Sequence, residues 1–182
     1  LAKIIMKQFE RSLESRAVSF LNDKVETIEE AFSGARDIIA EWINENEKAR
    51  NIVRRGFENS AEITSKIIKG KEEEAEKFRD YFDWKEPATN VPSHRLLAMR
   101  RGEKEDLLNL TMMPPEEEAL DLLEQMVLRG MGPDTAQVKI AIEDSYRRLL
   151  SRSMETELRL ATKQKADRQA IRVFTRNLRQ LL

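Results

Sequence analysis

The chain has 182 residues, of which 36% are charged and 40% hydrophobic, with a net charge of −1 and no cysteine. This length suffices for one domain with a real core or for two small helical lobes. The missing cysteines exclude a disulfide scaffold, a thiolate-bound metal and a cysteine nucleophile, and they fit a reducing cytoplasm. No apolar run approaches the ~20 residues that span a bilayer.

Amphipathic helices are expected to fill most of the first 60 residues. Apolar residues at spacings of three and four predict one helix over residues 3–21. Thr27 and Glu30 have the spacing of a capping box, and an apolar stripe that reaches Ile43 follows them. A third, shorter helix is expected over residues 47–59.

The middle of the chain combines helical patterns with segments of ambiguous structure. The apolar residues in 60–70 fit a helix or a strand, and residues 107–113 fit a strand or an extended segment. Whether these two segments pair as a small ribbon stays open. Residues 71–82 are predicted to form a helix, and Ser93 is expected to cap another that Gly102 ends.

The last third of the chain is predicted to be helical. A helix is expected over residues 116–129, with acids in its first turn, before the clearest break in the chain at residues 130–133. From Asp134, the expected N-cap, no glycine or proline occurs up to residue 182. We expect two long helices here, separated near residues 151–153.

These elements predict an all-α fold: a multi-helical array with long C-terminal helices and at most a minor short β ribbon. We expect a helical lobe over residues 1–132 and a long basic helical segment over residues 133–182 that leads to a domain downstream. Because the chain starts at Leu1 and ends within a helical pattern, we expect it to be a piece of a longer protein.

Residue types that serve in catalysis are present but are not arranged for it. His94 follows Ser93, yet neighbours in sequence do not form a catalytic dyad, and no Gly-x-Ser-x-Gly elbow occurs. The three glutamates at 72–74 diverge by ~100° each around a helix, so they do not converge on one metal ion. The Lys-Gly-Lys run at 69–71 lacks the spacing of a phosphate-binding loop. We therefore expect no enzymatic activity, no metal and no cofactor.

The segment 77–85 contains four aromatic residues and three cations next to them. The aromatic residues are Phe78, Tyr81, Phe82 and Trp84, and the cations are Lys77, Arg79 and Lys85. Aromatic rings among cations can stack nucleic-acid bases while the cations hold phosphates. The simpler interpretation, which we favour, is that the rings belong to the core, since large aromatic side chains dominate helical cores. Tyr81, Trp84 and His94 are also candidates for docking a partner protein.

Basic residues are unevenly distributed along the chain. Residues 147–182 contain ten basic and three acidic residues, a net charge of +7. Such a stretch is typical of a surface that contacts a polyanion, but it also fits an ordinary exposed helix face, and both interpretations stay open. The candidate nucleic-acid contacts over the whole chain are Lys69, Lys71, Lys77, Arg79, Arg95, Arg100, Arg101, Lys104, Arg168, Arg172, Arg176 and Arg179.

Five blocks of sequence occur in a specific order: GARDIIAEWI at 34–43, SKIIKGKEEEAEKFRDYFDW at 65–84, VPSHRLLAMRRGEKEDLL at 91–108, YRRLLSRSMETELR at 146–159 and ADRQAIRVFTRNLRQLL at 166–182. From about Leu21 onward the chain resembles the Tex family of bacterial transcription accessory proteins. The resemblance implies that the chain is the central helical part of a multi-domain protein. Its RNase H-like, helix-hairpin-helix and C-terminal OB-fold RNA-binding modules would lie outside this chain.

The resemblance also implies a function. We expect a non-catalytic helical scaffold in a cytoplasmic transcription protein that binds RNA or DNA through the full-length parent. RNA polymerase and other transcription machinery are candidate protein partners, and a module that docks on that machinery is the alternative function. Asp106 stands where glycine is common in the family, so the turn there is expected to differ.

Overall fold

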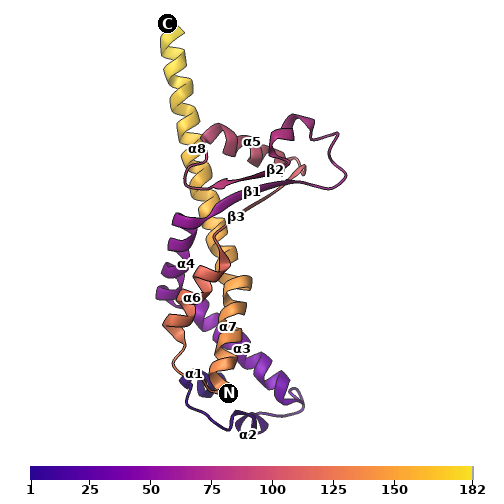
Figure 1. Ribbon diagram of the computed structural model, residues 1–182, viewed down its shortest axis with the longest axis vertical. Coiled ribbons are helices and arrows are strands. Elements are labelled where there is room, and N and C mark those ends of the chain that lie inside the picture. The colour runs from indigo at the N-terminus through magenta and orange to yellow at the C-terminus, as the bar shows by residue number, and fades with distance from the viewer. Residues whose placement is uncertain (182) are drawn as a thin grey trace. The chain divides into compact units, whose positions relative to one another are not determined.

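The computed structural model describes residues 1–181 (Figure 1). Contacts divide the chain into two compact units: Leu1–Arg54 with Glu116–Ser153, and Arg55–Pro115 with Met154–Leu182. The predicted lobes, 1–132 and 133–182, divide the chain differently, and each of them contributes to both units. Among the described residues, every helix is too short or too polar to span a lipid bilayer.

The first unit is helical. Its elements are α1 (Ala2–Lys7), α2 (Leu13–Val18), α3 (Ile28–Glu45), the start of α4 (Glu47–Ser60), α6 (Glu116–Val127), α7 (Pro133–Asp144) and the π-helical segment η2 (Ser145–Leu150). The capping box is confirmed: the Thr27 hydroxyl accepts from the Glu30 amide, and the Glu30 carboxylate accepts from the Thr27 amide. Helix α3 packs on α7, with Ile39 and Ile142 fully buried.

The prediction of one helix over residues 3–21 is wrong, because the chain turns at Gln8. This residue has a left-handed backbone with φ of 59° and ends α1. Its buried side-chain amide donates to the Val127 carbonyl at 2.8 Å and accepts from the Arg129 amide at 2.8 Å. These contacts with residues about 120 positions away stabilise the turn at Gln8 against the continuous helix that the local periodicity favours.

The N-cap of α7 lies two residues before the predicted one. Gly132 is the N-cap and Pro133 occupies the first turn, where its missing N–H costs nothing. The buried carboxylate of Asp134 accepts instead from the Glu10 amide and from the Thr135 amide, each at 2.8 Å. Asp134 therefore ties the N-terminal segment to the start of α7.

The predicted break near residues 151–153 is wrong as well. Helix α7 runs through η2 directly into α8 (Ser151–Leu181), which has 31 residues. The irregularity in this stretch is the π-helical segment at Ser145–Leu150, a wider turn that keeps the chain helical.

Tyr146 lies in that π-helical segment with only 1% of its surface exposed. Its hydroxyl has no hydrogen-bond partner among the described residues. Burial, with a smaller contribution from the charge of Glu116, raises the pKa of Tyr146 to about 12. The folded unit therefore favours the neutral phenol, at the cost of an unpaired buried hydroxyl.

We expect Tyr146→Phe to raise the free energy of unfolding at pH 7 by about 1 kcal/mol, because it removes that unpaired hydroxyl. In the parent chain the stabilising effect of the neutral phenol is complete below pH 10. It is lost between pH 10 and 12, where the unfolded tyrosine ionises and the folded one does not. Urea unfolding at several pH values should show this loss, about 2–3 kcal/mol, in the parent but not in Tyr146→Phe. If the free energy of unfolding fell equally in the parent and in Tyr146→Phe between pH 10 and 12, the raised pKa of Tyr146 would be contradicted.

The second unit contains a three-stranded antiparallel sheet. Its strands are β1 (Glu62–Ile67), β2 (Asp83–Pro87) and β3 (Leu108–Met113), in the order β2-β1-β3 (Figure 1). Ile63 lies opposite Met112, and Ser65 lies between Trp84 and Leu110. Residues 60–70 and 107–113 thus do pair. The fold is mainly α, as predicted, but this sheet is larger than the expected ribbon.

Helices α5 (Ser93–Lys104) and α8 supply the rest of the core of this unit. One cluster of buried side chains from the sheet, α5 and α8 comprises Ile63, Leu96, Met99, Leu110, Met112 and Ala166. The helix predicted over residues 71–82 is wrong in the first half of its length, and the part that is helical, Glu76–Tyr81, is a 3₁₀ helix, η1. There Phe78 is buried in a second cluster with Leu107 and Leu108.

The predicted ends of α5 are also wrong. Pro92 is the N-cap, and the Ser93 hydroxyl donates instead to the Gln169 side chain of α8. The helix continues through Gly102, which is buried, to Lys104. Asp106 follows with a φ of 55°. Gly102 is thus a packing residue and not a helix stop.

Candidate nucleic-acid interface

Two side chains of α8 bind the backbone of β3. Glu155 accepts from the Met112 amide at 2.8 Å, and Arg159 donates to the Leu110 carbonyl at 3.0 Å. The other guanidinium nitrogen of Arg159 forms an ion pair with Glu103 of α5. Arg159 is only 18% exposed. Strand β3, α5 and α8 are therefore joined through one guanidinium group.

The twelve candidate cations fall into two groups. Six of those in residues 66–104 form ion pairs with acids of the same unit: Lys71 with Glu74, Lys77 with Glu105, Arg79 with Glu76, Arg95 with Glu86, Arg100 with Glu103, and Arg101 with Glu105. Hydrogen bonds from Lys77 and then Arg101 lower the pKa of Glu105, so its carboxylate stays charged. The positive charges of these six cations are therefore largely neutralised by the acids that pair with them. Lys69 and Lys104 are exposed.

The second group is Arg168, Arg172, Arg176 and Arg179 on α8, which we call the arginine stripe. Spacings of four, four and three place them on one face of the helix, over about 16 Å at 1.5 Å per residue. All four are exposed, and among the described side chains none of them has an acidic partner. The stripe is therefore a row of uncompensated positive charge.

Sequence reasoning missed one neighbour of the stripe. Lys165 is exposed and lines a hollow of about 410 Å³ together with Arg168, Arg172 and Arg176. Its position three residues before Arg168 is the signal that could have identified it.

The end of α8 also carries exposed apolar side chains. Ile171, Phe174 and Leu178 are 65%, 63% and 45% exposed. At about 100° per residue, Phe174 and Leu178 lie about 160° and 120° around the helix from Arg172. Ile171 lies about 100° from Arg172 and lines a hollow together with Arg172, Arg176 and Arg179. The end of α8 thus presents a basic face that Ile171 borders, with Phe174 and Leu178 turned away from it.

The candidate docking residues lie in different environments. Tyr81 and Trp84 are half-buried and pack edge to face, with ring centroids 6.2 Å apart. The Trp84 indole donates to Glu86, and the Arg95 guanidinium lies 4.8 Å above its ring. Both rings border the core. Their docking role stays a prediction.

His94 is exposed at the start of α5. It lines a hollow of about 510 Å³ together with Leu97 of α5 and with Val173 and Phe174 of α8. A protein that docks on this unit would find apolar surface here and not at the Tyr81 ring. Docking at His94 also stays a prediction.

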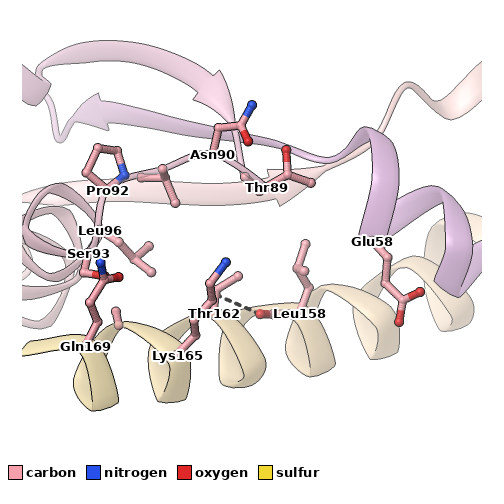
Figure 2. A pocket seen from close by; sticks show the side chains of 13 residues that line it. Glu58, Thr89, Asn90, Pro92, Ser93, Leu96, Leu158, Thr162, Lys165 and Gln169 are labelled. Atoms are coloured by element: carbon pink, nitrogen blue, oxygen red, sulfur yellow. Dashed lines mark hydrogen bonds between the residues drawn. The ribbon is translucent and has the colours of Figure 1, made fainter. Parts of the chain in front are cut away.

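A larger hollow, of about 610 Å³, lies between residues 88–93 and α8 (Figure 2). Glu58 and Lys165 are the ionisable residues of its lining. The hydroxyls of Ser93 and Thr162 already donate, to Gln169 and to the Leu158 carbonyl respectively. The lining therefore offers packing surface and a few amide groups, and not a converging set of acids, bases or nucleophiles.

Comparisons with known proteins identify the family. The model of the Tex central region-like family matches residues 9–174. The uncharacterized protein YdcI of Bacillus subtilis (strain 168) is 36% identical over 174 residues, which are 93% of this chain and 24% of that protein. The transcriptional accessory protein Tex of Neisseria gonorrhoeae is 33% identical over 188 residues, 100% of this chain and 25% of that protein. Protein YhgF of Escherichia coli (strain K12) is 37% identical over 165 residues, which are 84% of this chain and 21% of that protein.

These matches define the chain as a mainly helical segment shared by longer bacterial proteins. It belongs to the Tex central region-like family, which confirms the resemblance drawn from the sequence blocks. The chain spans about a quarter of the length of the relatives that it matches.

Proposed function

We propose that this chain is a non-catalytic helical scaffold of a Tex-type transcription accessory protein and that it contributes to nucleic-acid binding. Family membership and the name of the Neisseria gonorrhoeae relative support the role in transcription. Because the relatives are about four times as long, the complete activity would belong to the longer protein. Its site of action would be the cytoplasm, with RNA polymerase or other transcription machinery as the protein partner.

The observation that carries the nucleic-acid part of this proposal is the arginine stripe. Four exposed guanidinium groups without acidic partners among the described residues produce a local positive potential on a chain whose net charge is −1. A patch of this kind attracts a polyanion even when the whole protein is nearly neutral. The ion-paired cations of residues 66–104 lack this property, because acids screen them at close range.

The scaffold part rests on the construction of α8. With 31 residues it extends about 46 Å. Glu155 and Arg159 hold the sheet and α5 against its middle turns, and each residue from 168 to 180 is exposed, although the Gln169 side chain accepts from Ser93 of α5. A rigid helix that is packed at one part and exposed at another is suited to hold other elements at a fixed distance.

Direct titration tests this function. Fluorescence anisotropy of labelled 20-nucleotide DNA and RNA, single- and double-stranded, should show binding at low salt that weakens as salt rises, because phosphate contacts release counterions. The absence of binding to all four probes at low salt would contradict the nucleic-acid part. Cleavage of any probe in the presence of Mg²⁺ or Mn²⁺ would contradict the non-catalytic assignment.

A further inference from the structure

We infer that the arginine stripe binds the phosphates of one single-stranded nucleic acid, lying along α8, without reading its bases. This inference rests on the proposed function and specifies the ligand of the same helix. Its first basis is the shape of the stripe, which is a single straight row of four cations over about 16 Å. A flexible single strand can follow such a row, whereas each strand of a duplex winds away from a straight line.

The apolar side of α8 argues against insertion into a duplex groove. A helix in the major groove has phosphates on both sides of it. Here one side carries the arginines, and Phe174 and Leu178, both substantially exposed, lie on the other side. Placing the apolar side against a second row of phosphates would bring it no favourable contact, so contact with one backbone is the arrangement that this helix favours.

The same division of the helix removes base stacking from the interaction. Proteins that stack bases place aromatic rings next to the cations that hold the backbone. The aromatic residue of this segment, Phe174, lies on the side of α8 away from Arg172 and Arg176. A strand held by the arginines therefore has its phosphates bound and its bases free, so binding should be independent of sequence.

Arginine suits this contact better than lysine would. The planar guanidinium group presents several N–H donors, which can bind two oxygens of one phosphate at once. The exposed side chains have no competing carboxylate among the described residues, so no ion pair has to break before a phosphate binds. Four such contacts predict a salt dependence with a log–log slope of about −2.8 for a single strand.

The test compares two variants that lose the same charge in different places. The stripe variant carries Arg168→Gln, Arg172→Gln, Arg176→Gln and Arg179→Gln. The matched control carries Lys69→Gln, Lys71→Gln, Arg79→Gln and Lys104→Gln. Circular dichroism should show that both remain helical, since all eight side chains lie at the surface of the unit. The probes are labelled single strands of 20 thymidines and of mixed sequence, and a 20-base-pair duplex.

For the parent chain we expect the two single strands to bind within about twofold of each other and more tightly than the duplex. Their affinity should fall about 50-fold between 50 and 200 mM salt. The stripe variant should lose this salt dependence and most of its affinity, and the control variant should keep both. Equal losses in the two variants, an unaffected stripe variant or tighter duplex binding would overturn this inference alone. A parent chain that binds no probe would overturn the proposed function with it.

Discussion

Replacing Arg159 with alanine is expected to lower the free energy of unfolding of the second unit by about 2 kcal/mol. Its guanidinium group, 18% exposed, is shared between the Leu110 carbonyl and the carboxylate of Glu103. Truncation removes one of the two cations that pair with that carboxylate, itself only 28% exposed, leaves Arg100 as its partner, and leaves the carbonyl unpaired. Breaking a largely buried pair by removing one partner costs about 3–5 kcal/mol, and partial exposure together with the remaining Arg100 ion pair places this case below that range.

Arg168→Ala is the matched control, because it removes the same side chain from an exposed turn of the same helix and should change stability by less than about 0.5 kcal/mol. The two tryptophans lie in different units, so a Trp42→Phe background leaves Trp84 to report on the second unit alone. Urea unfolding followed by this fluorescence gives the comparison. Glu103→Gln combined with Arg159→Ala should cost less than the sum of the two single changes, because the two side chains contact each other. Similar stabilities of Arg159→Ala and Arg168→Ala would contradict the role of this contact.

Gly102→Val should lower the stability of the same unit by about 2–3 kcal/mol. A Cβ atom at position 102 would lie 2.6 Å from Cδ1 and 2.9 Å from Cγ of Leu108. Leu108 is 1% exposed and packs against Phe78, so it has little room to move away. Adding atoms to a filled core forces side chains off their preferred rotamers, typically at a cost of about 1–3 kcal/mol.

Gly34 is the control for this substitution. It lies in α3, and a Cβ atom there would meet nothing within 4 Å. Gly34→Ala should stabilise the chain by up to about 1 kcal/mol, because alanine favours the helix and no clash opposes it. Gly102→Ala combined with Leu108→Ala should be less destabilised than the sum of the two single changes. A Gly102→Val variant as stable as the parent would show that Leu108 can move aside.

Local signals predicted the elements that depend on near neighbours. The capping box at Thr27 and Glu30 joins residues three apart, so the sequence contains the whole interaction. Gly102 shows the opposite case. Its position after a helical pattern suggests a C-cap, but the reason for glycine is the approach of Leu108, which depends on how β3 packs. Strand β2 was missed for a related reason, since its polar residues become a strand only by pairing with β1.

The candidate interface was predictable in part. Helical spacing alone placed Arg168, Arg172, Arg176 and Arg179 on one face, because the helix is regular there. The sequence could not distinguish them from the cations of residues 66–104. That distinction depends on acids such as Glu105, which pairs with Lys77 from 28 positions away once η1 and α5 have packed together. Neutralisation of charge is a tertiary property, whereas the charge itself is a sequence property.

Strand β3 is an outer strand of its sheet, and the outward backbone groups of such a strand ordinarily invite another chain to pair with it. Glu155 and Arg159 occupy the Met112 amide and the Leu110 carbonyl. A foreign peptide could add to the sheet on this side only by displacing both side chains. The contacts that attach the sheet to α8 therefore also protect it from strand exchange and aggregation.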